Sequence, residues 1–357
     1  MKKLFFLFAA ALFCLIAAAE DQNSYRVLVL GDVHYDRTDL HADPKIVKAK
    51  GHIRNITMWK AKTPALLAAA GKLAETESAA FVIQLGDLTH GYAGTPELQT
   101  RMLREGLAAV KAYFPRTPLL IVRGNHDVSV SKGTADDCSP ADAVLIPATP
   151  ELPGLTKSQK NGNYALRKGK DLFIAVDGFL PAKKIVAFVR KTLDANPDAR
   201  YVFLLTHLPV LPASAKAPFW LLPGHYEIAE LLETRRALIL AAHTHVPSLT
   251  SRTTKRGKLV QLVVSSMGCE WEPERIVAPK ITSWQEFVEI GKARPPRGWN
   301  KKNRQRWPVL EAKGEYSFRQ LFLNSGSVLL RFDDNGCTVE YHTGGTRPAF
   351  VMPPPEW

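Results

Sequence analysis

Short apolar runs alternate along the chain with amphipathic segments, and this alternation predicts the main elements. The runs are rich in branched residues, which is typical of strands covered on both faces. We predict such strands at 26–32, 81–87, 119–122, 201–207, 237–245 and 258–266. The amphipathic segments predict helices at 63–78, 95–114, 183–197 and 225–236. Strands that alternate with helices at this spacing indicate β-α-β units and an α/β fold.

The remaining segments are less regular. Residues 164–178 have the pattern of a hairpin, and residues 327–342 form a second one around Asn335 and Gly336. Residues 267–325 are rich in Trp, Pro and basic residues, and within them residues 292–307 contain seven Lys or Arg and no acid. We interpret this insertion as a solvated loop that covers one edge of the domain. A substrate-facing lid is the alternative.

The amino terminus is different from the rest of the chain. Lys2 and Lys3 precede a short apolar run that ends in three alanines, which is typical of a secretory signal peptide. We expect residues 1–19 to be removed near Ala19, leaving a periplasmic or secreted single domain at 20–357 without a transmembrane segment. A membrane anchor is less favoured because the run is short. Lipid attachment at Cys14 is disfavoured by the bulky Phe13 before it.

Composition narrows the class of partner. The chain has 357 residues, of which 46% are hydrophobic and 23% charged, and this indicates a globular protein with a large core. The net charge of +13 favours acidic partners such as phosphates, nucleic acid or anionic lipid. Beyond the leader, three cysteines remain, so at most one disulfide can form within the chain. The sequence leaves open which of Cys138, Cys269 and Cys337 would form it.

Five of the apolar strands end on polar residues of the same few types. The endings are LGDVH (30–34), LGDLTH (85–90), RGNHD (123–127), THLP (206–209) and AHTH (242–245). Each ending alone fits a turn or a helix cap. Together they bring seven Asp, Asn and His side chains to one sheet edge, which independent turns do not explain. The carboxyl ends of such strands are where open α/β sheets place their sites.

These residue types favour metal binding. Imidazole nitrogen and carboxylate oxygen together suit manganese, iron or zinc, whereas an all-oxygen set would suit calcium or magnesium. Seven ligands exceed the need of one catalytic ion that keeps open positions, and they are enough for two. Two ions about 3.5–4 Å apart can share a carboxylate and a water and can hold the oxygens of a phosphoryl group.

In order and spacing, these motifs resemble the calcineurin-like metallophosphoesterase superfamily over about residues 26–266. The resemblance implies a two-sheet β sandwich flanked by helices, an α/β architecture. It implies that the first metal ion is held by Asp32, His34 and His245, that Asp87 bridges, and that the second ion is held by Asn125, His207 and His243. It also implies that His126 is the catalytic histidine and that Asp127 orients it.

The chain departs from the family pattern at a few positions. Ala242 stands where the last motif usually begins with Gly, and His90 stands where purple acid phosphatases carry a metal-binding Tyr. Arg123 resembles the phosphate-gripping Arg of protein serine/threonine phosphatases, with a surface Arg as the alternative. Tyr35 and His90 are candidate substrate or supporting groups. Surface or capping roles are the default for His41, His52, His90, His225 and His342.

The expected activity is hydrolysis of phosphomonoesters or phosphodiesters. A metal-bridging hydroxide would attack phosphorus, and His126 would protonate the departing oxygen as general acid. A nuclease is one alternative, favoured by the basic residues 292–307. A metal-binding scaffold without turnover is another, although a scaffold would be expected to have lost ligands.

Overall fold

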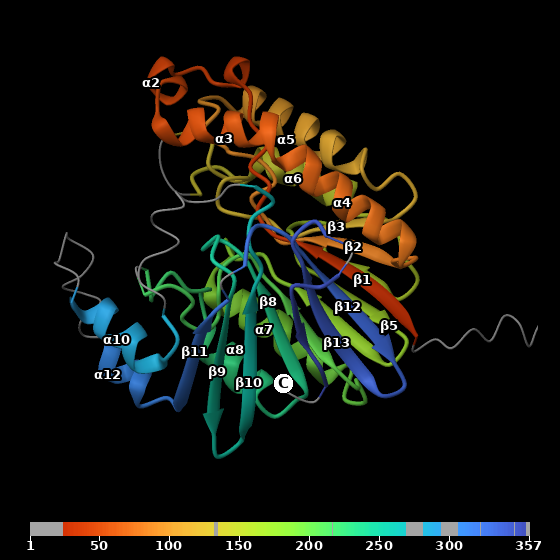
Figure 1. The fold of residues 1–357 in the computed structure, drawn as a ribbon, viewed down its shortest axis with the longest axis vertical. Coiled ribbons are helices and arrows are strands. Elements are labelled where there is room, and N and C mark those ends of the chain that lie inside the picture. Colours follow the sequence, from red (N-terminus) through yellow and green to blue (C-terminus); the bar gives the residue numbers. More distant parts are fainter. Residues whose placement is uncertain are drawn as a thin grey trace, which may run out of the picture.

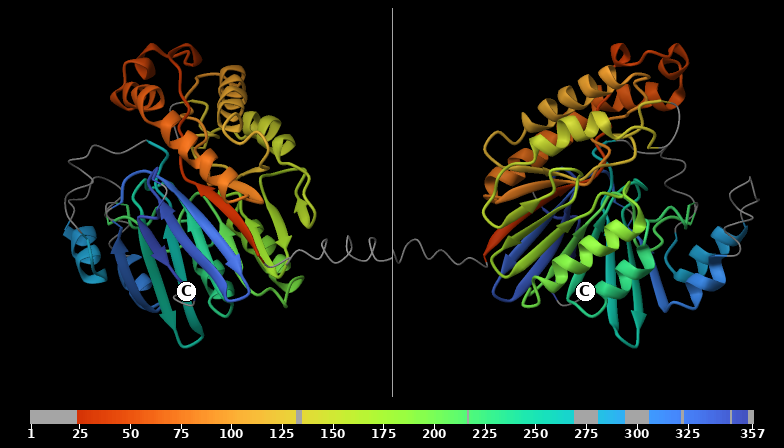
Figure 2. Two further views of the ribbon diagram at one scale, coloured as in Figure 1. Left: turned by 45° about the vertical axis from the view of Figure 1, so that its right-hand side comes forward. Right: turned by 180° about the vertical axis from the view of Figure 1, so that it is seen from behind.

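Two β-sheets packed face to face form the centre of the molecule (Figure 1). The computed structural model describes residues 24–131, 135–215, 217–268, 281–293, 306–321, 323–345 and 347–354. One sheet has six strands and the other has eight, and helices cover the outer face of each (Figure 2). This arrangement confirms the predicted α/β sandwich of two sheets flanked by helices.

The six-stranded sheet is mixed. In spatial order its strands are β14 (Phe350–Met352), β13 (Gly336–His342), β12 (Ser327–Asp333), β1 (Tyr25–Leu30), β2 (Phe81–Gln84) and β3 (Leu119–Ile121). The pairs β1–β2 and β2–β3 are parallel, whereas β12 pairs antiparallel with both β1 and β13. The predicted hairpin at 327–342 is thus present, and it extends the sheet from the far side of β1.

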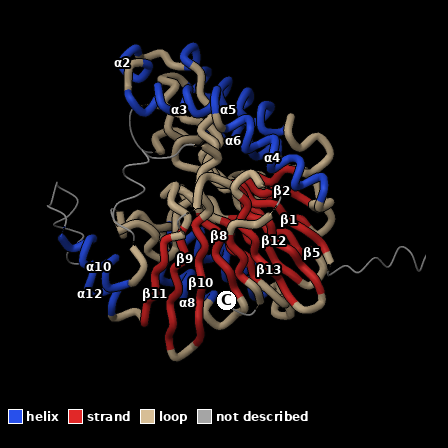
Figure 3. The backbone as a smooth tube through the Cα atoms, in the orientation of Figure 1, coloured by secondary structure: helices blue, strands red, loops and turns tan. Residues whose placement is uncertain are grey.

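The eight-stranded sheet is also mixed. In spatial order its strands are β11 (Glu315–Gln320), β9 (Ser248–Thr254), β10 (Gly257–Val263), β8 (Ala237–Ala241), β7 (Val202–Leu205), β6 (Asp171–Ala175), β5 (Tyr164–Lys168) and β4 (Leu155–Lys157). The four central strands from β10 to β6 run parallel, and antiparallel strands flank them on both sides. Figure 3 shows the strands of both sheets as one central block.

The helices form two outer layers and one lateral group. Those described are η1 (Thr38–Leu40), α2 (Pro44–Val47), α3 (Lys50–Ala61), α4 (Thr63–Thr76), α5 (Pro96–Lys111), α6 (Ser139–Ala148), α7 (Ala182–Asp194), α8 (His225–Leu232), α10 (Trp284–Ala293) and α12 (Arg306–Glu311). Helices α4, α5 and α6 pack on the six-stranded sheet, and α7 and α8 pack on the eight-stranded sheet. The N-terminal layer is seen at the top of Figure 1.

Alternation within the strands builds three apolar layers. In β1, Val27 and Val29 lie between the two sheets, while Leu28 and Leu30 lie under the helices. Strand β7 does the same with Phe203 inside and Leu204 against α7 and α8. Both faces of these strands are therefore buried, which explains why the sequence shows unbroken apolar runs rather than a polar alternation.

Two elements gave no periodic signal in the sequence. Helix α3 buries His52 and Asn55 in place of an apolar stripe, so the usual helical pattern is missing. Strand β9 reads SLTSRTT, mostly Ser and Thr without a regular apolar alternation, and its pairing with β10 and β11 defines it as a strand.

The prediction of a solvated loop at 267–325 is wrong for the part that the structure describes. Strand β11 pairs antiparallel with β9 and becomes the edge of the eight-stranded sheet. Helices α10 and α12 place Phe287, Trp307 and Leu310 in a small buried cluster with Phe219 and Phe318. Residues 294–305, which carry most of the basic charge, lie outside the described residues.

Three further expectations concern segments that the structure describes only in part. The proposed leader at 1–19 lies outside them. Cys138 and Cys337 are both free thiols, and Cys269 is not described. Among the described residues, no helix is long and apolar enough to cross a bilayer.

A buried polar contact joins the two sheets at one end. Asp171 on β6 is fully buried and accepts a 2.9 Å hydrogen bond from the Tyr25 hydroxyl on β1. Arg200 donates to both oxygens of the same carboxylate, at 2.7 and 3.0 Å. Burial and the charge of Asp171 raise the pKa of Tyr25, so this hydroxyl stays a hydrogen-bond donor.

We expect Asp171→Ala to lower the free energy of unfolding by about 3 kcal/mol, because it leaves Arg200 and Tyr25 without their shared partner. Denaturant unfolding followed by circular dichroism measures the loss. The matched control is Asp198→Ala, which removes the 77% exposed partner of Arg167 and should cost about 1 kcal/mol or less. Equal losses in the two variants would contradict a stabilising role for the buried contact.

Candidate metal centre

The predicted ligands meet at one edge of the two sheets. Asp32 and His34 follow β1, Asp87 follows β2, and Asn125 follows β3, all in the six-stranded sheet. His207 follows β7, and His243 and His245 follow β8, in the other sheet. Each residue comes just after the carboxyl end of a strand, and the face-to-face packing of the sheets brings these ends together.

The loops that carry the ligands have unusual backbone conformations. His34, Asp87, His243 and His245 have φ values of 51°, 51°, 69° and 56°. A non-glycine residue in this left-handed region costs about 1–2 kcal/mol, and such residues gather at functional sites. Close approach of the loops adds a constraint, because a Cβ on Gly124 would overlap the backbone and carboxylate of Asp87. The backbone is thus held in conformations that position these four side chains.

Four of the ligands form a first group, with donor atoms within 4.8 Å of one another: Asp32, His34, Asp87 and His245. Asp32 Oδ2 lies 2.6 Å from His245 Nε2, and His34 Nε2 lies 3.1 Å from the same nitrogen. Asp32 Oδ2 is buried, and its 2.6 Å contact with His245 Nε2 lacks the geometry of a hydrogen bond. Burial, helped by His126, holds the pKa of His34 well below its usual range, so this imidazole is neutral and able to bind a cation.

A second group is formed by Asp87, His207 and His243, with Asn125 beside them. His207 Nε2 lies 3.0 Å from Asn125 Oδ1, 3.2 Å from His243 Nδ1 and 3.3 Å from Asp87 Oδ2. The other ring nitrogen, His207 Nδ1, donates to the carbonyl of Leu85 at 2.9 Å. That hydrogen bond leaves Nε2 as a bare acceptor in neutral His207, which is the usual arrangement of a metal-binding histidine.

The atoms around His207 Nε2 are mostly lone-pair acceptors, so a positive charge among them is favourable. Burial alone would lower the pKa of His207, but the charges of Asp87 and Asp32 outweigh it and raise the pKa to about 9. The carboxylates around His207 therefore favour a positive charge at this position. Burial lowers the pKa of His243 to about 3, so that ring is neutral. A metal ion would supply the charge and displace the proton.

Asp87 belongs to both groups, with Oδ2 3.7 Å from His34 Nε2 and 3.3 Å from His207 Nε2. Burial acts to raise its pKa, but His207 and His126 hold the pKa well below the usual range, so the carboxylate is charged. The residues therefore fit two cations that share Asp87. Imidazole nitrogens with carboxylate and amide oxygens suit manganese, iron or zinc.

A family model of the calcineurin-like phosphoesterases matches residues 25–247, which include all seven predicted ligands. The chain belongs to the calcineurin-like phosphoesterase family. Among solved structures, its fold is similar to that of a dimetal phosphatase from Danio rerio, with a TM-score of 0.53 and 12% identity over 90% of this chain and 97% of that chain.

A structure of PhoD gives the same TM-score of 0.53, with 10% identity over 92% of this chain and 68% of that chain. At such identities these two likenesses support the fold alone. No curated protein matches the chain.

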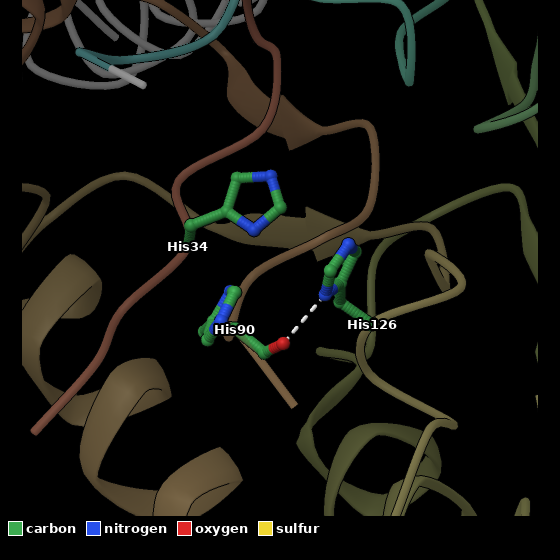
Figure 4. A group of neighbouring side chains, drawn as sticks. All are labelled: His34, His90 and His126. Atoms are coloured by element: carbon green, nitrogen blue, oxygen red, sulfur yellow. Dashed lines mark hydrogen bonds between the residues drawn. The ribbon is translucent and has the colours of Figure 1, made fainter. Parts of the chain in front are cut away.

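His126, the catalytic histidine in the family pattern, lies beside the first group. Its ring is 4.7 Å from the His34 ring and 5.2 Å from the His90 ring, measured between centroids. His126 Nδ1 lies 2.5 Å from the backbone oxygen of His90 (Figure 4). Because that oxygen can only accept, Nδ1 carries the proton and donates. His126 is partly exposed, unlike His34 and His90, so Nε2 is the nitrogen left for a substrate.

Asp127 does not orient His126, so that expectation from the family resemblance is wrong. Its buried carboxylate accepts hydrogen bonds from the N–H of Gly124 at 2.9 Å and from the N–H and hydroxyl of Thr89 at 3.0 and 3.2 Å. Burial and the nearby charge of Asp87 raise the pKa of Asp127 to about 7. Asp127 ties the loop after β3 to the loop after β2.

A buried polar network lies behind His90, and it includes His41 and His52, for which surface or capping roles were expected. The Asn55 amide donates to His90 Nδ1 at 2.5 Å. Asp36 lies 2.7 Å from His52 Nδ1 and 2.7 Å from His41 Nε2. The network explains why α3 buries polar residues. Two sequence signals pointed to it: Asp36 two residues after His34, and the pair His52 and Asn55 on one helical face.

The other two histidines differ from each other. His225 Nδ1 donates to the carbonyl of Leu222 at 3.0 Å, just before helix α8, and makes no capping hydrogen bond to the helix. His342 is buried beside Glu340, with 3.2 Å between His342 Nε2 and the carboxylate, so a surface role is wrong for it.

Arg123 and Tyr35 were candidate substrate groups, and both are engaged elsewhere. Arg123 is 2% exposed, so the surface alternative is wrong, and its guanidinium pairs with Asp177 and with Asp142. Tyr35 is buried and its hydroxyl donates to Glu105 on α5 at 3.0 Å. Through these contacts both side chains support the loops that carry them.

Loaded with manganese, the wild-type chain should bind about two ions, and His243→Ala should retain about one because only the second group loses a ligand. Asp87→Asn should weaken both ions, since a neutral amide replaces the shared charge. Equilibrium dialysis with elemental analysis measures the stoichiometry.

The control is His225→Ala, a histidine outside both groups, which should keep the wild-type stoichiometry. A single ion in the wild type, or an Asp87→Asn variant that binds metal as the wild type does, would contradict a shared carboxylate.

Proposed function

We propose that this chain is an exported phosphoesterase that hydrolyses phosphomonoesters or phosphodiesters with two metal ions. The observation that carries the proposal is the pair of ligand groups sharing Asp87, with His126 beside one of them. The ions, when bound, would polarise the phosphoryl oxygens and lower the pKa of a water. Asp32, His34 and His245 with Asp87 would hold one ion, and Asn125, His207 and His243 with Asp87 the other.

His126 is the proton donor in this proposal. Its Nδ1–H is engaged by the His90 carbonyl, which fixes the ring and presents Nε2 to the substrate. A protonated Nε2 can pass its proton to the oxygen of the departing alcohol as the P–O bond breaks. Family membership supports this reaction class, and the partial exposure of His126 supports its access to a substrate.

Two alternatives are less favoured. The nuclease reading rested on residues 292–307, of which 294–305 lie outside the described residues. At the ends of that segment, Lys292 pairs with Glu311 at 2.9 Å and Trp307 is buried, so both take part in local packing. A metal-binding scaffold without turnover does not explain why all seven predicted ligands and His126 lie in one place.

A general acid matters in proportion to the basicity of the leaving group, and its usual contribution is about 10²–10⁴-fold. We therefore expect His126→Ala to slow hydrolysis of an alkyl phosphate ester far more than that of a p-nitrophenyl ester. Steady-state kinetics on both esters, with metal analysis of the same samples, measures the difference.

The matched variant is His243→Ala, which removes a metal ligand and should slow both esters together. If His126→Ala loses metal, or slows the two esters equally, the role of proton donor is wrong. If the metal-loaded wild type hydrolyses neither ester, the phosphoesterase proposal itself fails.

Export rests on the leader pattern at 1–19. We expect a bacterial host to release a mature chain that begins at Glu20, and to accumulate the precursor when Lys2 and Lys3 are both changed to Glu. Intact mass and cell fractionation measure both results, with Lys2→Arg as the charge-preserving control. Finding the uncleaved chain in the cytoplasm would overturn export.

A further inference from the structure

An exposed tryptophan lies at the edge of the metal centre. Among the described residues the exposed large apolar side chains are Ile53, Trp220, Val309 and Val351, and Trp220 is the aromatic one. It is 48% exposed, and its ring centroid lies 5.2 Å from that of His243, a ligand of the second group. The folding of the chain therefore leaves a large apolar ring in solvent beside the expected position of a metal ion.

The loop between β7 and α8 holds the backbone of Trp220 in place. The N–H of Trp220 donates to the carbonyl of Ala217 at 3.2 Å, and that of Leu222 donates to Pro209 at 2.8 Å. The preceding Phe219 is buried and packs on Trp307, with 5.2 Å between ring centroids. The backbone on both sides of Trp220 is therefore fixed, which reduces the cost of ordering this residue when a ligand binds.

Trp220 and His126 lie beside different ligand groups. Trp220 contacts His243 of the second group, while His126 contacts His34 of the first. A phosphorus held by both groups would therefore have one substituent toward His126 and another toward Trp220. His126 serves the substituent that leaves, so Trp220 faces one that stays on phosphorus. A monoester has no second ester substituent, whereas a diester does.

The chemistry of an exposed indole indicates what that substituent is. Its flat face gains most from stacking against another planar ring, with offset or tilted geometry. The ring of Trp220 contacts His243 and the residue is 48% exposed, so part of the indole is available to a ligand. We propose that Trp220 binds a planar aromatic group retained on phosphorus, so that the chain prefers phosphodiesters carrying an aryl or nucleobase-like substituent. This inference rests on the proposed phosphoesterase activity.

Two diesters with the same leaving group test the assignment. Bis-p-nitrophenyl phosphate and methyl p-nitrophenyl phosphate both release p-nitrophenolate, but they retain an aryl and a methyl group respectively. Stacking of a ring on an aromatic side chain is worth about 1–3 kcal/mol, and 1.4 kcal/mol is tenfold. We therefore expect Trp220→Ala to lower the ratio of kcat/KM for the aryl diester over the methyl diester by about tenfold or more, chiefly through KM.

Two variants serve as controls. Trp220→Phe keeps an aromatic face and should keep most of the preference, whereas Val351→Ala truncates an exposed apolar residue of the edge strand β14 and should leave it unchanged. An equal loss on both diesters in Trp220→Ala would overturn the inference, since a ring that only shields the metal centre would affect them alike.

The outcome on p-nitrophenyl phosphate, a monoester, separates this inference from the proposed function. If the metal-loaded wild type hydrolyses the monoester and neither diester, the aryl diester assignment is overturned while the phosphoesterase proposal stands. If it hydrolyses none of the three, both fall.

Discussion

Asp87 is a buried carboxylate shared by two groups of electron-pair donors, and the rest of the site is arranged around its charge. The lone pairs of such closely spaced oxygen and nitrogen atoms repel one another when no cation lies between them. Burial removes the water that would screen this repulsion. The raised pKa of His207, about 9, reflects this demand for positive charge. Two metal ions would satisfy it, which makes the dinuclear site a consequence of how the donors are packed.

Holding these donors together requires a rigid frame. The ligands follow five strands of two different sheets, and the strands are apolar on both faces, so their ends cannot shift without disturbing a packed layer. Four of the ligands also sit in left-handed backbone conformations. The burial of the strands supplies the free energy that keeps these unfavourable turns in place.

Two further features lie next to the ligands: the support of His126 and the exposed ring of Trp220. The His90 carbonyl fixes the ring of His126, and His90 is held in turn by Asn55, with Asp36 and its histidines behind. On the other side, Trp220 presents an exposed ring next to His243. His126 and Trp220 therefore lie beside different ligand groups, and we assign proton transfer to the first and substrate binding to the second only as proposals.

The sequence by itself determined the β-α-β order, the buried strands and the polar residues at their ends, because strand periodicity and residue chemistry are local properties. It did not reveal that His90 supports His126 through its backbone, that Asp127 binds Gly124 and Thr89, or that Arg123 is buried between two carboxylates. Nor did it reveal β11 as a sheet edge. These contacts join residues far apart in the chain, and only the packing of the two sheets decides which of them meet.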